Sequence, residues 1–179
     1  MLPLETERLI IRPFEEADRA LFHEINSDEK VMEHYPYRRT RAQSMKCSTR
    51  GAYGLRKPAT ATPPLKSGRR ANASVTVIWP YRSLSHSCPQ ARSRLAGGYW
   101  GNGYTTEAGK ALRADGFTRR WLNEIFSFAV PANRRLLAVI NRIGTVRDFD
   151  HPKIVPEHAH LRRHVVYSLT KESWESAQR

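Results

Sequence analysis

The sequence predicts one α/β domain, and two observations carry that prediction. Segments with strand-like and helix-like periodicity alternate before residue 38 and again after Leu95. The length of 179 residues and a hydrophobic fraction of 40% are sufficient for a single core.

The first expected elements are a strand and a helix. Residues 7–14 (ERLIIRPF) contain a continuous apolar run, which is typical of a largely buried strand. Residues 15–26 predict a helix, because apolar side chains recur there at a spacing of four residues. Ser27 then caps a short helical turn over residues 28–32, which Pro36 ends. The apolar stripe of the helix consists of Ala17, Leu21, Phe22 and Ile25.

The segment 38–94 differs from both of its flanks. Between His34 and Thr106 the chain carries thirteen Lys and Arg residues and no Asp or Glu, so this part holds the whole net charge of +13. Prolines interrupt it, and only residues 74–79 (SVTVIW) predict a strand. Such a composition is typical of disordered segments, although structureless loops of this length are rare inside compact domains. The middle strands, at about 40–94, are therefore not defined by the sequence.

Regular periodicity returns after the basic segment. A helix over residues 105–117 precedes a strand over residues 124–130, whose side chains alternate between two faces. Asn133 caps the clearest helix of the chain, residues 134–143. A polar loop over residues 148–160, a strand over residues 164–169 and a polar tail over residues 171–179 complete the expected order.

A glycine turn, residues 99–108 (YWGNGYTTEA), opens this second half. Its two glycines allow a tight backbone turn. The hydroxyls of Thr105 and Thr106 are placed to cap the helix that follows, with Glu107 in the first turn. Such a helix start gathers amide N–H groups and the positive end of the helix dipole, which suits a phosphate or pyrophosphate. Because the turn matches neither the Walker loop nor the dinucleotide fingerprint, an ordinary glycine-containing loop is the alternative.

Cysteine usage and hydropathy limit the protein class. Cys47 and Cys88 stand far apart without partners at metal-ligand spacing, so we expect neither a disulfide framework nor a metal site. The first residues contain no apolar signal-peptide core, and no run approaches the length of a membrane span. We therefore expect a cytoplasmic protein with no membrane partner.

Taken in order, these elements resemble the GNAT N-acetyltransferases, specifically the RimJ/RimL-type branch, which is named for ribosomal-protein acetyltransferases. Three stretches carry the resemblance: residues 4–37, the glycine turn with its helix, and residues 123–169, from NEIFSFAVPANRR through DFDHP to LRRHVVYSL. The resemblance implies one GNAT-type domain over residues 1–170. Its fold would be a mixed central sheet that is flanked by helices and splits into a V, where acetyl-CoA binds.

The resemblance also implies a site for acetyl-CoA. The family's pyrophosphate loop, Arg/Gln-x-x-Gly-x-Gly/Ala, maps onto residues 100–105, where Gly103 matches and both ends depart from the pattern. Asn133 corresponds to a family Asn beside the pantetheine arm, and it equally fits a plain helix cap. The acetyl-CoA-binding residues that this mapping predicts are Trp100, Gly101, Asn102, Gly103, Tyr104, Thr105, Thr106 and Asn133.

The implied reaction is attack of a neutral amine on the acetyl thioester, through a tetrahedral oxyanion, with a thiolate as leaving group. Many family members place a Tyr acid in the helix after the Asn, but Ile140 occupies that position here. Catalytic residues are unknown, because Glu24 and Glu33 suit solvated helix faces and the candidate histidines suit loops or strands. Those histidines are His151, His158, His160 and His164. The acceptor amine, on a protein N-terminus or a small molecule, is open, as is the choice between monomer and homodimer.

The middle segment departs most from the family. Before the glycine turn, only Arg94 and Leu95 match the family's strand, and residues 87–93 (SCPQARS) lack apolar alternation. A reading-frame shift across residues 38–94 would explain the absent acids and the lost periodicity. Two alternative functions follow: a degenerate, inactive GNAT scaffold, or a nucleic-acid-binding protein that uses the basic segment and its aromatic residues. Nucleic acid is the less favoured partner, because a solvated basic run explains the composition more simply.

Overall fold

The computed structural model contains one mixed sheet and describes residues 4–13, 15–35, 38–44, 59–62, 75–81, 90–144, 146–152 and 163–178. The strands are β1 (Leu4–Glu5), β2 (Ile10–Pro13), β3 (Ala59–Thr62), β4 (Val75–Tyr81), β5 (Gln90–Leu95), β6 (Glu124–Ala129), β7 (Val146–Pro152) and β8 (Arg163–Thr170). The α-helices are α1 (Arg19–Ser27), α3 (Tyr104–Thr118), α4 (Arg134–Arg142) and α5 (Lys171–Ser176). Within the described residues the sheet has the order β1-β2-β3-β4-β5-β6-β8-β7. The predicted α/β class is therefore confirmed.

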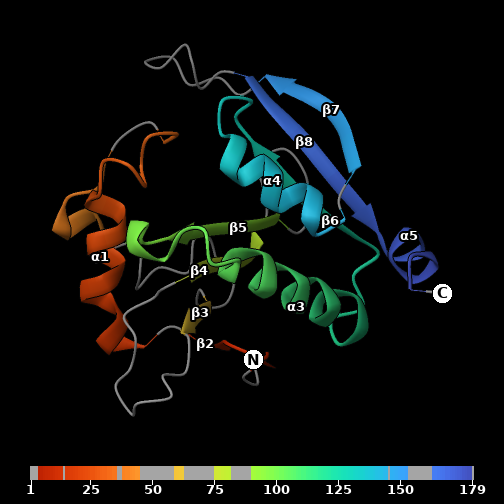
Figure 1. Cartoon of the computed structure of the whole chain (residues 1–179), viewed down its shortest axis with the longest axis horizontal. Coiled ribbons are helices and arrows are strands. Elements are labelled where there is room, and N and C mark those ends of the chain that lie inside the picture. Colours follow the sequence, from red (N-terminus) through yellow and green to blue (C-terminus); the bar gives the residue numbers. More distant parts are fainter. Residues whose placement is uncertain are drawn as a thin grey trace.

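Helices α3 and α4 cross the same side of the sheet and create two core regions (Figure 1). Under α3, the apolar side chains of the N-terminal strands meet those of β5 and of the helix; the buried members are Leu9, Ile11, Leu95, Ala108 and Leu112. Under α4, Ile140 packs against the sheet with Ala129 of β6 and Val165 and Tyr167 of β8. Burial of these side chains fixes both helices on the sheet.

Strands β5 and β6 form the junction between the two halves of the sheet. They pair in parallel at a single register position, Gln90 with Phe126, whereas β6 and β8 pair along six positions. The other neighbouring pairs of the sheet are antiparallel. Beyond Gln90 the two parallel strands separate, so the sheet splits where the resemblance predicted a V.

Several element predictions are confirmed. Strand β4 includes most of residues 74–79, and β6 alternates as expected, with Ile125, Ser127 and Ala129 on the buried face. The predicted helix 134–143 is α4, which ends one residue earlier, and Gly144 follows it with a φ of +82°. A positive φ of this size is accessible to glycine at little energetic penalty, which explains the stop.

Other predictions are wrong, and strand pairing explains most of the errors. Residues 90–93 belong to β5 despite their lack of apolar alternation, because β5 has a neighbour on each side. The expected polar loop begins instead as β7, which pairs with β8 at the edge of the sheet. The expected polar tail contains α5, capped by Thr170, whose Oγ1 accepts a hydrogen bond from the Ser173 amide at 3.1 Å. Trp174 of α5 lies 5.2 Å from Phe117 between ring centroids, so α5 is packed onto the domain.

Much of the basic segment lies outside the described residues, including 45–58, 63–74 and 82–89. The same holds for residues 153–160, and with them His158 and His160. The frame-shift hypothesis and the nucleic-acid interpretation thus remain predictions from the sequence. In the part of the chain that the structure describes, no helix combines the length and the apolar character needed to span a membrane.

Candidate functional site

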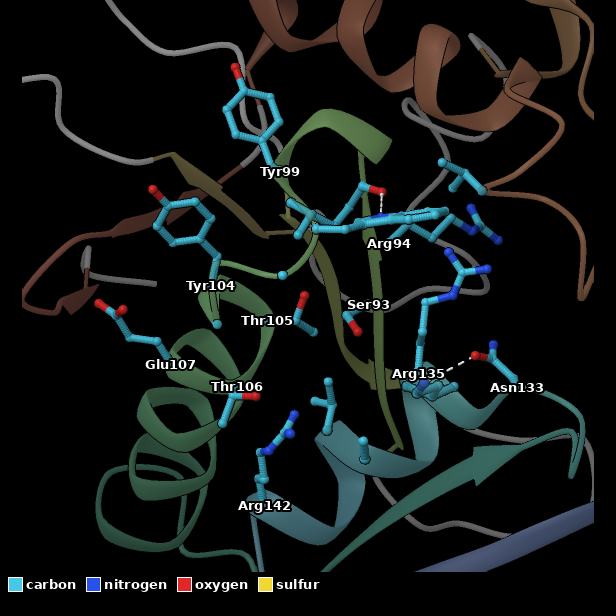
Figure 2. Close-up of a pocket in the computed structure, with 18 of the residues that line it drawn as sticks. Ser93, Arg94, Tyr99, Tyr104, Thr105, Thr106, Glu107, Asn133, Arg135 and Arg142 are labelled. Carbon is cyan, nitrogen blue, oxygen red and sulfur yellow. Dashed lines mark hydrogen bonds between the residues drawn. The ribbon is translucent and has the colours of Figure 1, made fainter.

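A cavity of about 770 Å³ lies where β5 and β6 separate. The end of β5, the glycine turn, the first turns of α3 and one side of α4 form most of its wall (Figure 2). The turn that follows α1 closes the opposite side, with Lys30, Glu33, His34 and Tyr35 among its lining residues. The cavity therefore joins segments from both halves of the chain.

The glycine turn starts α3 with a left-handed backbone. Gly101 and Gly103 have φ values of +81° and +78°, which L side chains adopt only with strain. Gly103 is the N-cap residue, and no side chain caps the helix. The prediction that Thr105 or Thr106 caps α3 is therefore wrong, because the left-handed glycine already ends the preceding turn and the helix begins at Tyr104.

The amides of this helix start are directed at the cavity. The Glu107 amide donates the first helical hydrogen bond, to the Gly103 carbonyl oxygen at 3.0 Å. The amides of residues 104–106 precede that bond and have no partner within the helix. Residues 103–106 all line the cavity. With the positive end of a 15-residue helix behind them, these amides form a site suited to a phosphate group.

Trp100 connects the glycine turn to both neighbouring elements. Its indole Nε1 donates a hydrogen bond to the carbonyl oxygen of Leu95 on β5, at 2.8 Å. The Arg135 guanidinium of α4 lies over the indole ring, 4.2 Å from the centroid. The Trp100 ring thus holds the Arg135 cation beside the glycine turn.

Arg8, in the loop between β1 and β2, contacts both the glycine turn and the first turn of α3. Its Nε and backbone amide donate to the two carboxylate oxygens of Glu107, at 2.7 and 2.9 Å, and Thr6 Oγ1 donates to the same carboxylate at 2.5 Å. Burial alone would raise the pKa of Glu107, but the hydrogen bonds from Thr6 and Arg8 outweigh it and lower this pKa. Arg8 Nη1 also donates to the Asn102 carbonyl oxygen at 3.0 Å. The ionised Glu107 therefore holds a guanidinium beside the glycine turn.

Asn133 serves as the cap of α4. Its side-chain oxygen accepts a hydrogen bond from the Leu136 amide at 3.0 Å, and the residue also lines the cavity (Figure 2). The cap uses only the oxygen of the side-chain amide. The two sequence interpretations of Asn133, a helix cap and a residue beside the pantetheine arm, therefore do not exclude one another geometrically.

Cations surround the cavity near the helix start. Arg8, Lys110, Arg135 and Arg142 line it, from β1–β2, α3 and α4. Three carboxylates also line it: Glu7, Glu107, which is paired with Arg8, and Glu33, which lies 3.4 Å from Arg135 and 3.8 Å from His34. The wall near α3 therefore carries excess positive charge, which is favourable for an anionic ligand.

Comparison with known proteins identifies this arrangement. The model of the Acetyltransferase (GNAT) domain matches residues 8–146. The chain belongs to the GNAT acetyltransferase family. It is 24% identical over 174 residues to the uncharacterized N-acetyltransferase YnaD of Bacillus subtilis (strain 168), covering 96% of this chain and 98% of YnaD. The fold class predicted from the sequence is thereby confirmed as the GNAT fold.

Solved structures share the fold at low sequence identity. A GNAT-family acetyltransferase from Bacillus anthracis superposes with a TM-score of 0.79 at 22% identity, covering 96% of this chain and 99% of that one. The aminoglycoside acetyltransferase AAC(6')-Ib, solved in complex with coenzyme A, gives a TM-score of 0.75 at 16% identity, with coverages of 96% and 99%. These likenesses concern the GNAT fold and extend over nearly the whole chain.

Seven of the eight residues that the sequence predicted as the acetyl-CoA site of this GNAT domain line the cavity. Asn102 is the exception, since its side-chain amide donates to the carbonyl oxygens of Tyr99 and Trp100 at 3.2 and 3.1 Å and so braces the turn. Of the proton acceptors considered from the sequence, Glu33 lines the cavity, whereas Glu24 is exposed on α1 and His164 lies on β8. Ile140, at the position of the family Tyr, is buried in the core.

Sequence reasoning did not predict several charged or titratable residues of the cavity, among them Arg8, His34 and Arg135. These three residues reach the cavity through tertiary structure, whereas Arg94 matches the end of the family's strand, a match that predicted no site role for it.

Proposed function

We propose that this GNAT protein is an N-acetyltransferase that transfers an acetyl group from acetyl-CoA to an amine. The observation that carries the proposal is the uncapped start of α3, where the amides of residues 104–106 and two left-handed glycines face a 770 Å³ cavity. Such a start is suited to a pyrophosphate. The coenzyme A complex of AAC(6')-Ib, which shares the fold, supports the same ligand.

In this proposal different residues of the cavity bind different parts of acetyl-CoA. The amides of residues 104–106 bind the pyrophosphate, with Lys110 and Arg142 supplying positive charge from the adjoining helix faces. Trp100 and Asn102 keep the turn in shape. The side-chain NH₂ of Asn133, at the start of α4, donates to an amide carbonyl oxygen of the pantetheine arm in this proposal. Acetyl-CoA supplies the activated acetyl thioester.

The amine must lose a proton when it is acetylated, and we assign its removal to His34. This side chain lines the cavity, is 18% exposed, and has Glu33 at 3.8 Å. Imidazole is a common general base in enzymes, and the ring of His34 faces the space where the amine would lie. The proposed proton route thus leads from the amine nitrogen to the His34 ring.

Finer assignments belong to the proposal as well. The RimJ/RimL-type branch is proposed from the three stretches that carry the resemblance, and a cytoplasmic location is proposed from the cysteine usage. A degenerate scaffold and a nucleic-acid-binding protein are the competing functions. The first would keep the fold without ligand binding, and the second would use the basic segment 38–94.

The test is a thermal melt of the full chain with and without acetyl-CoA. At a concentration of one hundred times the dissociation constant, a specific ligand stabilises the folded state by about 2.7 kcal/mol. Gly103→Asp places a side chain and a negative charge in the pyrophosphate cradle, so its melt should not respond. Gly98→Asp is the matched control: it adds the same charge nearby, where a Cβ meets open space and the glycine has no positive φ.

A response in the wild type and in the Gly98 variant, together with none in the Gly103 variant, would support the proposal. A cooperative wild-type melt that ignores acetyl-CoA would favour the degenerate scaffold. A melt that shifts with a short RNA or DNA duplex at low salt, and not with acetyl-CoA, would favour nucleic-acid binding.

A further inference from the structure

The cavity has a second wall, opposite the start of α3. It consists of Lys30, Glu33, His34 and Tyr35 from the turn after α1, together with Arg94 of β5. We call these five residues the acceptor wall. Figure 2 shows Arg94 across the cavity from Glu107 and Thr106. A cofactor bound at the α3 start therefore leaves this wall to the other substrate.

Among the residues that the structure describes, Arg94 is held in place by neutral groups. Its Nη1 donates to the side-chain oxygen of Asn26 at 2.6 Å, and its guanidinium lies 4.3 Å from the Tyr35 ring centroid. Its Nε is buried and, among the described residues, has no hydrogen-bond partner. An amide oxygen and an aromatic ring orient a guanidinium but do not neutralise it. Since Nε is buried and one N–H of Nη1 is used by Asn26, the N–H groups of Nη2 and the second N–H of Nη1 remain for a ligand among the described residues.

The strand geometry separates Arg94 from the phosphate site. Leu95, the next residue, is buried against α3, so Arg94 points to the opposite face of β5, toward α1. Arg8, Lys110 and Arg142 already supply charge on the α3 side. The cofactor phosphates thus do not account for the Arg94 guanidinium.

The charges of the acceptor wall disfavour a polyamine. Lys30 and Arg94 are positive, and the wall's carboxylate, Glu33, already lies within 4 Å of Arg135 and His34. A ligand with several ammonium groups would meet uncompensated positive charge among the described residues. A ligand that combines one amine with one carboxylate would complement Arg94, since the planar guanidinium fork matches a carboxylate.

We infer that Arg94 is a specificity-determining residue that binds a carboxylate on the acceptor, so that the acceptor is a small amino-acid-like amine. The inference rests on the proposed acetyltransferase function. The carboxylate binds the guanidinium on the β5 side, and the amine of the same molecule extends toward the thioester. Asn26 and Tyr35 act as positioning residues, because they hold the guanidinium in one orientation.

The experiment compares two acceptor mixtures, the standard amino acids and the corresponding amino-acid amides, which lack the carboxylate. Because an amide also makes the α-amine less basic, rates are compared at equal concentrations of the free amine. Spermidine is the polyamine probe. Acetylated products are detected by mass spectrometry, and kcat and KM are then measured for the best acceptor and for its amide. The wild type should prefer the amino acid by about 10- to 100-fold in kcat/KM, the factor that a hydrogen bond to a charged group provides.

Arg94→Gln should abolish this preference through a higher KM for the amino acid, while Arg94→Lys should restore part of it, because it keeps the charge and loses the fork. The control is Arg134→Gln, which removes an equal charge from the exposed start of α4 and should keep the preference. Thermal melts with acetyl-CoA accompany every variant.

The outcomes separate the inference from the proposed function. A wild type that does not respond to acetyl-CoA would overturn both. A wild type that responds to acetyl-CoA and acetylates amides or spermidine as well as amino acids would overturn the inference alone. The same holds if Arg94→Gln folds, binds acetyl-CoA and retains the preference for amino acids.

Discussion

Arg8 and Glu107 are 99 residues apart in sequence and form an ion pair in which Arg8 Nε and Nη2 both lie 2.7 Å from Glu107 Oε2. The contact ties the N-terminal strands to the first turn of the helix that starts the phosphate site. Because Arg8 also donates to the Asn102 carbonyl oxygen, the pair fixes the glycine turn from outside. The shape of the candidate cofactor site therefore depends on a residue outside every recognisable motif.

Glu107→Gln should destabilise the fold by about 1–2 kcal/mol at pH 7, because it weakens hydrogen bonds to a charged group while half of the Arg8 side chain is exposed. The pKa of Glu107 is lowered from its ordinary value of 4.5. Its stabilising contribution is thus complete above that pH and is lost as the pH falls through the lowered pKa. Urea unfolding from pH 7 to pH 3 should show the difference from wild type narrowing in acid. Glu24→Gln, on the exposed side of α1, is the control, and a difference independent of pH would contradict the assignment.

Lys110→Gln and Arg142→Gln should each weaken acetyl-CoA binding by about 2- to 5-fold, since both cations line the cavity and are exposed to solvent. Both variants should also reduce the salt dependence of the affinity. Isothermal titration calorimetry at two salt concentrations measures both effects. Arg134→Gln should leave the affinity within twofold of wild type, and an equal loss there would show that net charge alone is responsible.

His34→Gln should lower kcat by about 100-fold at neutral pH with little change in the KM for acetyl-CoA, because it removes the proposed proton acceptor. The rate of the variant should instead rise with pH, as the free amine deprotonates without help. Steady-state kinetics from pH 6 to pH 10 would show this. His23→Gln is the matched control: His23 Nδ1 lies 3.3 Å from Ser44 Oγ and does not line the cavity. Equal rates for the His34 variant and wild type would remove His34 from the mechanism.

Trp174→Ala should destabilise the domain by about 2–3 kcal/mol, because the indole packs on the fully buried Phe117 at the end of α3. Trp121→Ala should change the free energy of unfolding by about 0.5 kcal/mol or less, since that side chain is 77% exposed. Urea denaturation of both variants makes the comparison. Similar values for the two would mean that α5 contributes little to the fold.

The elements that the sequence predicted well depend on local signals. The helix 134–143 has an amphipathic stripe and a capping Asn, and the strand 124–130 alternates along its own length. The glycine turn also has a local signature, because positive φ at Gly101 and Gly103 requires residues without a Cβ. The start of α3 was predicted at residue 105 with a hydroxyl cap, whereas the helix begins at Tyr104 after the N-cap Gly103. Both a glycine and a hydroxyl residue are common at this position, so the local sequence did not distinguish between them.

The errors concern features that arise from pairing between distant segments. Strand β5 has little apolar alternation of its own and forms because β4 and β6 supply its hydrogen-bonding partners. Strand β7 depends on β8 in the same way, and α5 depends on the apolar surface around Phe117. Composition within a window contains no information about such partners.

By itself, the sequence determined the α/β class, the order of most elements and the glycine turn of the candidate phosphate site, because short-range periodicity and backbone sterics act within a few residues. The tertiary structure decided the split between β5 and β6 and the set of charged side chains around it. Arg8, His34, Arg94 and Arg135 reach one cavity only after the strands pair and the helices pack on the sheet. The proposed match between these charged side chains and the two substrates therefore depends on the assembled cavity, because the side chains come from segments that are distant in the sequence.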